Sequence, residues 1–223
     1  MTLPDWVEPV ARYMLEEGLT GTLRIAVFAV VGSALIGVAL GTLLTLDSRV
    51  VRAPIRLYIE VWRGLPILVT IFIIYFALPS ASDTLRFDPF TAAAIGLTLW
   101  GSAQVAEATR GAVGSIPREQ HEAAAALGFG WFGRHRYVIL PQALRRLLPP
   151  FVSLLVNIIQ NTTIAQVIGA AELLETGERS AERLVFTTLD SHALEIYGAV
   201  AVVFFVISFP LTRLAAVLEK RLA

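Results

Sequence analysis

The sequence predicts an all-α, polytopic membrane protein with five transmembrane helices. Hydrophobic residues make up 56% of its 223 positions and charged residues only 16%, whereas soluble domains carry about 25% charged residues. The mean hydropathy is +0.68. Several apolar runs also approach the roughly 20 residues that a helix needs to cross the hydrocarbon core of a bilayer. Lipid is therefore the expected solvent for most of the chain.

Five segments are expected as spans, and they comprise residues 20–46, 57–78, 89–113, 151–174 and 193–217. The first and the last are the most continuously apolar. In the first span, Ser33, Gly37 and Gly41 recur at every fourth residue. Such a stripe of small residues lets a second helix approach closely, so we expect it to be a packing surface.

The second and third spans carry ionisable side chains. Glu60 with Arg63 and Glu107 with Arg110 are each spaced by three residues, which places both members of a pair on one helix face. Ionisable groups in a span usually pair or line a cavity, and near a membrane face they can also reach the aqueous boundary. We favour structural or gating pairs, and direct contact with a solute is the alternative.

The fourth span is interrupted at its middle by four polar residues. Irregular backbone at membrane depth is tolerated where it lines a cavity, and transporter sites commonly lie at such breaks. Two side chains of the third span could face the same space. The predicted solute-binding set is Asn157, Gln160, Asn161, Thr162 and Thr163 with Gln104 and Trp100. The alternative is that these groups only form hydrogen bonds between helices.

Residues 1–18 are expected to form a short extracytoplasmic amphipathic segment that precedes a transmembrane domain at 19–223. The segment has neither a basic leader nor an apolar core of the length that a signal peptide needs. An apolar face of Trp6, Val7, Val10, Tyr13 and Met14 lies opposite Asp5, Glu8, Arg12 and Glu16. We expect this helix to lie along the outer membrane surface. The alternative is a disordered tail.

The distribution of basic residues predicts the orientation, because cytoplasmic loops are enriched in Lys and Arg. With the N-terminus outside and five crossings, 13 of the 18 basic residues fall inside, and they are Arg49, Arg52, Arg56, Arg63, Arg110, Arg118, Arg134, Arg136, Arg145, Arg146, Arg213, Lys220 and Arg221. The C-terminus is then cytoplasmic. The outer face is predominantly acidic.

The chemistry of an enzyme is not apparent in this sequence. Lys220 is the only lysine and follows no glycine-rich phosphate-binding loop. The three histidines, His121, His135 and His192, do not have the spacing of a helical zinc site. We expect no catalytic residue, no metal site and no cofactor bound by this chain. A membrane-embedded enzyme or a passive scaffold protein remains the competing class.

A polar, basic interval at about 115–137 predicts a short helix. Pro117 suits the first turn of a helix, Glu119 lies within that turn, and helix-forming residues continue through Leu127. Gly128 and Gly130 can end the helix. Four consecutive alanines present almost no side chain, so the helix could seat deeply in a groove of another protein. The alternative is an ordinary surface helix.

The spacing of this interval resembles a known motif. Glu122-Ala123-Ala124, three residues, Gly128, nine residues, Val138, one residue and Leu140-Pro141 match the cytoplasmic loop of permease subunits of ATP-binding-cassette (ABC) importers. The resemblance implies that Glu122, Ala123, Ala124, Gly128, Leu140 and Pro141 couple the chain to a separate ATPase. It also implies a type I ABC importer permease fold.

Three further stretches narrow the resemblance to polar amino acid permeases of the histidine and glutamine type. They are the residues 60–69, the residues 107–123, and the polar residues from Asn157 to Leu173. Leu65 stands where that family usually has Thr, and Glu119 stands where it usually has Gly. The resemblance covers nearly the whole chain.

The resemblance implies a solute, partners and a location. The solute would be a polar amino acid, and the neutral Asn161 favours glutamate, glutamine or aspartate over a basic amino acid. The expected partners are cytoplasmic ABC ATPase subunits that use ATP and Mg, a second permease subunit, identical or related, and an extracytoplasmic amino-acid-binding protein. The location would be the bacterial plasma (inner) membrane. An importer permease for another small solute, such as methionine or an osmolyte, is the alternative.

Overall fold

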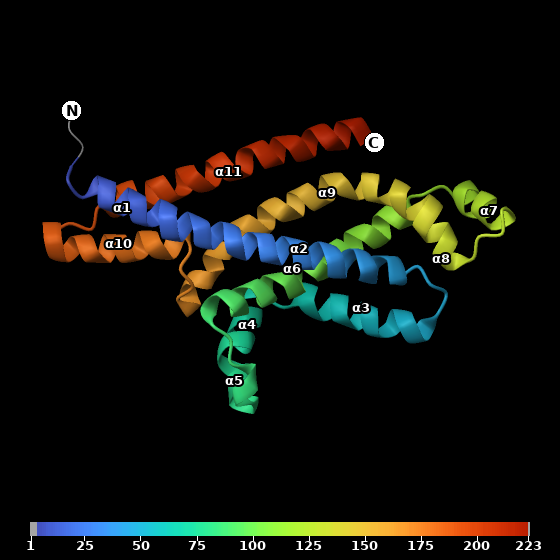
Figure 1. Cartoon of the computed structure of the whole chain (residues 1–223), viewed down its shortest axis with the longest axis horizontal. Coiled ribbons are helices and arrows are strands. Elements are labelled where there is room, and N and C mark those ends of the chain that lie inside the picture. Colours follow the sequence, from blue (N-terminus) through green and yellow to red (C-terminus); the bar gives the residue numbers. More distant parts are fainter. Residues whose placement is uncertain (1–3, 223) are drawn as a thin grey trace. The chain divides into compact units, whose positions relative to one another are not determined.

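The computed structural model describes residues 4–222, so Met1–Leu3 of the predicted N-terminal segment and Ala223 lie outside the described residues. Every regular element in the described part is a helix (Figure 1), which confirms the all-α prediction. In chain order they are α1 (Val7–Tyr13), η1 (Met14–Leu19), α2 (Thr20–Leu43), α3 (Arg49–Gly64), α4 (Ile67–Phe72), η2 (Ile73–Ala77), α5 (Leu78–Ala81), η3 (Asp83–Leu85), α6 (Pro89–Gly114), α7 (Arg118–Ala126), α8 (Trp131–Arg134), η4 (His135–Ile139), α9 (Leu140–Asn161), η5 (Thr162–Ile168), α10 (Leu173–Thr188) and α11 (Ala193–Leu222).

The chain forms two compact units that interleave in the sequence. Unit 1 comprises Met1–Ala29, Ile67–Leu97 and Val156–Pro210, and unit 2 comprises Val30–Pro66, Thr98–Leu155 and Leu211–Ala223. The predicted division at residue 18 does not coincide with either unit, because the helix of α1 and η1 continues directly into α2.

Within the described residues, three helical stretches are long and apolar enough to cross a membrane: Val7–Leu43, Trp131–Ile168 and Ala193–Leu222. The pair Arg49–Gly64 and Ile67–Ala81 makes a fourth if it counts as one broken span. The helix α6 has 26 residues, which is more than the roughly 20 needed to span a bilayer, but its second half carries Glu107 and Arg110. A count of five spans therefore stays a prediction.

The N-terminal helix of unit 1 packs on protein. Met14 is buried together with residues of α10 and α11, and Trp6 and Val10 pack against the same cluster. Glu8, Arg12 and Glu16 are exposed. The predicted amphipathic face therefore exists, but it covers α10 and α11 instead of lying free for the membrane surface, because these helices also present apolar residues that need burial.

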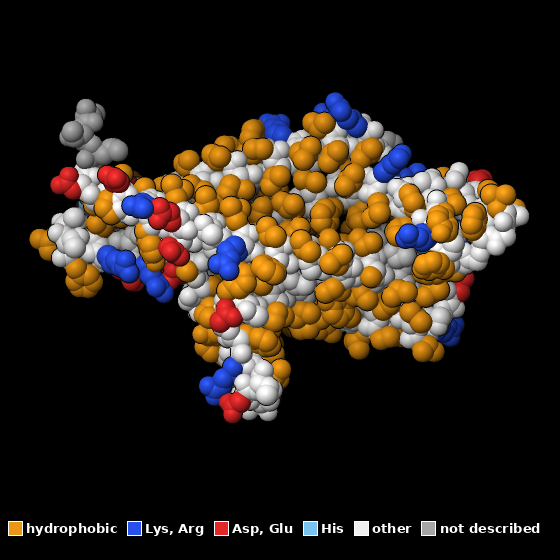
Figure 2. All heavy atoms as spheres, in the orientation of Figure 1, with side chains coloured by type: hydrophobic (Ala, Val, Ile, Leu, Met, Phe, Trp, Pro, Cys, Tyr) orange, Lys and Arg blue, Asp and Glu red, His pale blue; other side chains and the backbone are white. Residues whose placement is uncertain are grey.

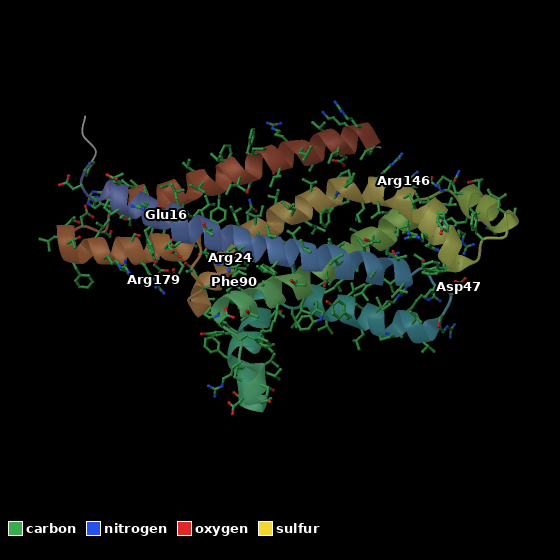
Figure 3. All side chains as sticks on the ribbon, viewed as in Figure 1. Glu16, Arg24, Asp47, Phe90, Arg146 and Arg179 are labelled. Carbon is green, nitrogen blue, oxygen red and sulfur yellow. The ribbon has the colours of Figure 1, made fainter. Side chains whose placement is uncertain are left out.

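Glycine permits close packing of α2 on α10 in the same unit. A β-carbon added at Gly18 would lie 2.1 Å from Thr176 Oγ1, and one at Gly21 would lie 1.9 Å from the carbonyl oxygen of Ala171. The buried Thr22 hydroxyl accepts the backbone N–H of Leu173 at 3.0 Å. In Figure 3, Arg24 lies near Phe90, with the guanidinium 5.3 Å from the ring centroid.

The small-residue stripe of α2 continues into unit 2, where it contacts α6 as predicted. Ser33 is fully buried and its hydroxyl donates to the carbonyl oxygen of Thr98 at 3.4 Å. A β-carbon at Gly37 would lie 2.5 Å from Val105 Cβ. Without side chains at these positions, the two helix backbones pack directly on each other.

Also in unit 2, α3 packs beside the end of α2 and beside α6 (Figure 1), with Ile55 and Ile59 buried in that contact. Tyr58 and Ser102 share a 2.7 Å hydrogen bond. The expected single span at 57–78 is divided instead, because the helix ends at Gly64 and Leu65 is extended. Pro66 explains the break, since the residue before a proline is disfavoured in the helical conformation.

Large apolar side chains remain exposed along the helices, as expected for a surface covered by lipid. Figure 2 shows hydrophobic side chains spread over the visible face. On α2 they include Phe28, Val31 and Leu35, and on α11 they include Phe205 and Val206. In water such a surface would aggregate, so the exposure is consistent with the membrane location that the composition predicts.

Candidate coupling loop and solute-facing residues

The predicted loop helix is α7, Arg118–Ala126, with Pro117 immediately before it. This agrees with the helix expected from Pro117 to about Leu127. Its first turn carries Glu119, which suits the positive end of the helix dipole. Arg118 Nε and Glu122 Oε1 form an ion pair at 2.8 Å, and both side chains are largely exposed. Such exposed pairs contribute about 0–1 kcal/mol, so Glu122 is not an essential support of the loop.

Gly128 ends α7 by a left-handed cap. Its φ is +83°, its N–H donates to the Ala125 carbonyl at 2.9 Å, and the Phe129 N–H donates to the Ala124 carbonyl at 3.1 Å. These two bonds form the Schellman arrangement, in which glycine avoids the steric cost of a side chain at positive φ. The glycine predicted to end the helix therefore has a conformational reason to be glycine.

The four alanines of α7 do not form one uniform face. Ala124 is 2% exposed, whereas Ala123, Ala125 and Ala126 are exposed. Ala124 is thus buried inside this chain, and the expectation that it seats in a groove of another protein is wrong for this structure. The reason is that α7 packs on η4 and α8 of its own loop, and a helix buries one side against its support.

Side chains from α8, η4 and α9 hold α7 in place. Gln142 Nε2 donates to Gln120 Oε1 at 3.2 Å, and the rings of His121 and His135 lie edge to face at 6.2 Å. Burial and the nearby Arg134 lower the pKa of His121, which favours the neutral form of its ring. These contacts give the loop helix a fixed seat within unit 2.

A second brace lies at the start of the loop. Arg146 of α9, labelled in Figure 3, donates to the Ser115 hydroxyl at 3.0 Å and also to the Ser115 carbonyl oxygen. The sequence did not identify this contact, because the two residues are 31 positions apart and neither belongs to a recognisable motif. Arg146 therefore ties the end of the third predicted span to the beginning of the fourth.

Leu140 and Pro141 lie inside a helix instead of at its end. The helical stretch runs without interruption from Trp131 to Ile168, so Pro141 does not end it. Pro141 lacks the N–H that would bond one turn back and normally kinks a helix. Here the π-helical turn η4 immediately precedes it, and wider turns of this kind absorb irregularities in the hydrogen-bond ladder.

The predicted polar break of the fourth span is a change of helix type in unit 1. The α-helix α9 ends at Asn161, and the 3-10 helix η5 follows from Thr162 and packs on α4. The Asn161 amide donates to the Asn157 carbonyl at 2.8 Å, and the Thr163 hydroxyl donates to the Gln160 carbonyl at 2.8 Å. These contacts stabilise the change from the α-helix to the 3-10 helix.

Two side chains of this region remain available. Asn157 and Gln160 are exposed, spaced by three residues on one face, and their amides have no hydrogen-bond partner within residues 4–222. Thr162 is fully buried and its hydroxyl donates to the Ile159 carbonyl at 2.7 Å. Thr162 therefore cannot touch a solute in this structure, and its assignment to the solute-binding set is corrected.

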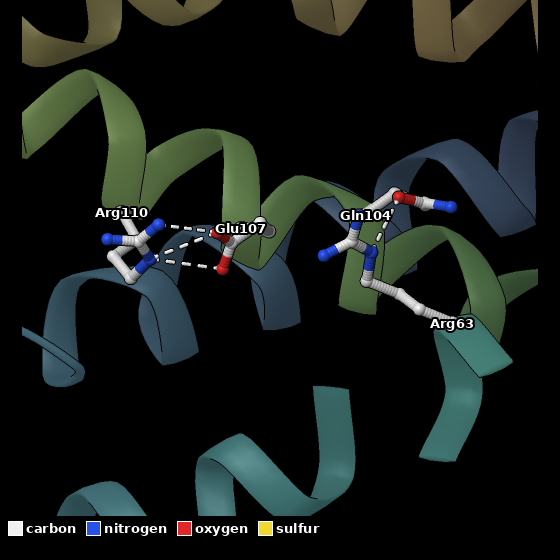
Figure 4. A network of polar contacts seen from close by, with 4 residues as sticks. All are labelled: Arg63, Gln104, Glu107 and Arg110. Carbon is white, nitrogen blue, oxygen red and sulfur yellow. Dashed lines mark hydrogen bonds and ion pairs between the residues drawn. The ribbon is translucent and has the colours of Figure 1, made fainter. Parts of the chain in front are cut away.

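The third-span candidates Trp100 and Gln104 are half-buried on α6 in unit 2. Gln104 Oε1 accepts a hydrogen bond from Arg63 Nε at 3.1 Å (Figure 4).

The ionisable residues of α3 and α6 form one of the two predicted pairs. Arg110 Nε donates to both carboxylate oxygens of Glu107, at 3.0 and 3.2 Å (Figure 4). Glu60 and Arg63 do not pair, because the Arg63 side chain reaches across to Gln104 on the neighbouring helix. The expectation of a Glu60–Arg63 pair is therefore wrong, and a gating role for any of these residues stays a prediction.

No group of three or more His, Cys, Asp or Glu side chains among the described residues is arranged to hold a metal ion. Instead, the described site comprises a braced loop helix with a glycine cap in unit 2 and an exposed amide face on α9 in unit 1. Together with the apolar spans, these features are those of a membrane-embedded protein.

Comparison with known proteins specifies the family. The sequence matches the family described as "Binding-protein-dependent transport system inner membrane component" over residues 19–223. The chain belongs to this family.

The similarity extends over whole chains. The glutamine transport system permease protein GlnP of Escherichia coli (strain K12) is 41% identical over 209 residues, covering 94% of this chain and 93% of that protein. The probable glutamine ABC transporter permease protein GlnM of Bacillus subtilis (strain 168) is 32% identical over 211 residues, with coverage of 94% and 93%. A crystal structure of an amino acid ABC transporter with histidines gives a TM-score of 0.80 at 29% identity, covering 99% of this chain and 100% of that one.

Proposed function

We propose that this chain is the permease subunit of an ABC importer for a polar amino acid of the glutamine type. The observation that carries the proposal is the braced helix α7, with its exposed alanines and its Gly128 cap, in a chain whose apolar helices suit a membrane. The 41% identity to a glutamine permease over 94% of this chain supports the solute class.

The proposed assembly contains three further kinds of subunit. Cytoplasmic ATPases that use ATP and Mg would bind α7, a second permease subunit, identical or related, would complete the translocation path, and an extracytoplasmic protein would deliver the amino acid. In the proposed orientation the N-terminus is outside and the C-terminus is cytoplasmic, as the arginine distribution indicates. Closure of the ATPases on ATP would move α7 and open the path outwards.

The seat of α7 determines which residues are free for an ATPase. Ala123, Ala125 and Ala126 present the exposed alanine surface, and Glu122 extends beside it. Ala124 and Gly128 act indirectly, since Ala124 holds α7 to its own chain and Gly128 ends the helix. Leu140 and Pro141 are the first two residues of α9, so they would transmit a movement of the loop into that helix.

The amide face of α9 is the proposed point of solute contact. Asn157 and Gln160 offer neutral donors and acceptors, which suit the side-chain amide and the charged ends of glutamine. Because neither amide carries a negative charge, this face offers no ion-pair partner for the side chain of a basic amino acid. The closing experiment measures ATP hydrolysis by the complex of permease, ATPase and binding protein reconstituted in liposomes, with L-glutamine, L-glutamate and L-arginine supplied in turn.

We expect glutamine or glutamate to stimulate ATP hydrolysis and uptake. Asn157→Ala should lower uptake at subsaturating solute. Ser153→Ala, one turn earlier on α9, should not, since that hydroxyl already donates to the Pro149 carbonyl at 3.4 Å. Stimulation by arginine and not by glutamine or glutamate would reject the proposed solute class.

Glu122 provides a test of the coupling contact. Glu122→Gln should leave thermal stability unchanged, because its pair with Arg118 is exposed, but it should reduce transport per ATP hydrolysed. Glu16→Gln is a matched control, because Glu16 also forms an exposed i, i+4 pair, with Arg12 at 2.9 Å. Equal coupling in the parent and both variants would argue against a role for Glu122.

A further inference from the structure

A small charged pocket lies between α3 and α6 in unit 2. Its volume is about 300 Å³, at the small end of the roughly 300–1,000 Å³ typical of ligand pockets. Leu44 and Ile59 contribute apolar walls, and the charged lining residues are Arg56, Glu60, Arg63, Glu107 and Arg110. All of these residues belong to one unit.

The charges in this pocket are not balanced by their neighbours. Arg110 donates hydrogen bonds to the Glu107 carboxylate from two guanidinium nitrogens, Nε and Nη2, so these two residues satisfy each other. Arg63 donates to the neutral amide of Gln104 and forms no ion pair with a carboxylate, although its charge and that of Arg56 both act on Glu107 from a distance. Three charged groups of the pocket are therefore left without an ion-pair partner: the cations Arg56 and Arg63 and the anion Glu60.

The lack of pairing is unusual for residues so placed. Arg56 and Glu60 are spaced by four and Glu60 and Arg63 by three, and both spacings allow ion pairs on a helix. Within residues 4–222, neither the Arg56 nor the Glu60 side chain forms a hydrogen bond or an ion pair. Opposite charges held apart around a pocket are suited to a ligand that carries both signs.

We propose that this pocket binds the α-amino and α-carboxylate groups of the transported amino acid, as a solute position separate from the amide face of α9. Arg56 and Arg63 bind the carboxylate, because guanidinium groups match carboxylate geometry. Glu60 accepts hydrogen bonds from the ammonium group. A simple anion would leave Glu60 unpaired, and a simple cation would leave both arginines unpaired.

This inference rests on the proposed function, because it takes an amino acid as the solute. In the proposed orientation the pocket lies toward the cytoplasmic side, where solute is released. Apolar Leu44 and Ile59 form walls against which the aliphatic part of the solute packs. The recognition would then depend on groups that all amino acids share, whereas the amide face of α9 would distinguish their side chains.

The test measures equilibrium binding to the purified complex of permease and ATPase without the binding protein. The probes are L-glutamine, N-acetyl-L-glutamine, which lacks the ammonium charge, and L-glutamine amide, which lacks the carboxylate. The variants are Arg56→Gln and Glu60→Gln. Arg52→Gln is the matched control, because it removes an arginine from the same helix one turn outside this pocket.

We expect two L-glutamine sites per permease chain, of which one weakens by about tenfold or more in either variant, the effect of losing a hydrogen bond to a charged group. Glu60→Gln should not change the binding of N-acetyl-L-glutamine. Arg56→Gln should not change the binding of L-glutamine amide. Arg52→Gln should bind all three probes as the parent does.

The test distinguishes failure of this inference from failure of the proposed function. If the complex transports glutamine but both variants bind it with the parent stoichiometry and affinity, the pocket is not a solute site and the proposed function stands. If no polar amino acid binds or stimulates the complex, both proposals are overturned. A loss of binding shared by the Arg52→Gln control would also overturn the inference, because it would show a general effect of the α3 charge.

Discussion

Replacing Gly41 with alanine should disrupt the contact between α2 and α6. The added β-carbon would lie 2.4 Å from the carbonyl oxygen of Ala106 and 2.6 Å from Thr109 Cβ, whereas ordinary contacts begin at 3.4 Å. The nearest obstacle is backbone, so the helices would have to move apart by about 1 Å, which closely packed interiors resist.

The expected change in the free energy of unfolding is the difference between two opposing effects. Overpacking a tight contact costs about 1–3 kcal/mol, and the alanine offsets up to about 1 kcal/mol because it favours the helix more than glycine. A net loss of about 1–2 kcal/mol should lower the melting temperature by roughly 2–8 °C for a chain of this size. Thermal unfolding of the purified permease in detergent measures the shift.

Gly111→Ala provides the matched control for this prediction. Gly111 also lies within α6, but a β-carbon there would meet nothing within 4 Å. Its melting temperature should equal or exceed that of the parent, because only the helix-propensity term applies. A Gly41→Ala variant as stable as the parent would show that α2 and α6 do not pack as closely as described.

Three further changes should have distinct effects. Gly128→Ala forces a side chain to positive φ, at about 1–2 kcal/mol, and should lower transport per ATP hydrolysed, whereas Gly130→Ala should not. Thr22→Val removes the acceptor of a buried backbone N–H at the start of α10, so the free energy of unfolding should fall by about 1–3 kcal/mol. Hydrogen bonds from the first turn of α6 hold the pKa of Asp88 below its ordinary 3.8. The lowered pKa means that this carboxylate stabilises the fold above pH 3.8 and that the contribution is lost as the pH falls through the folded-state pKa, so the melting temperatures of the parent and Asp88→Asn should converge in acid.

Local signals predicted the loop helix well. Pro117 before the helix and Gly128 after it act through their own backbone conformations, and both effects can be read from a few neighbouring residues. The small-residue stripe of α2 was also readable, because its four-residue spacing places Gly37 and Gly41 on one helix face. These features depend on short sequence distances.

Features that depend on tertiary packing could not be predicted in the same way. Ala124 is buried because α7 rests on η4, and no local pattern distinguishes it from Ala123 or Ala125. Arg63 reaches Gln104, 41 residues away, instead of the nearer Glu60. A helix can also continue through a proline when a π-helical turn precedes it, as it does before Pro141.

The predicted solute-binding set was also wrong where a polar residue is buried. Thr162 belongs to a polar run that indicates a solute site, yet its hydroxyl bonds to the helix carbonyl of Ile159. Threonine hydroxyls commonly form such local bonds, so residue type alone does not reveal which polar groups are free. Asn157 and Gln160 were distinguished only by their exposure.

Site-specific crosslinking from α7 tests the central claim most directly. The chain has no cysteine, so Ala125→Cys introduces a single thiol on the exposed side of α7, and Ala81→Cys introduces one at the end of α5 on the predicted outer side. We expect the thiol at position 125 to crosslink the ATPase subunit, with a yield that changes on ATP binding, and the thiol at position 81 to remain uncrosslinked to it. Labelling of the position-125 thiol by an impermeant reagent from outside the cell, with no crosslink to an ATPase, would contradict the account.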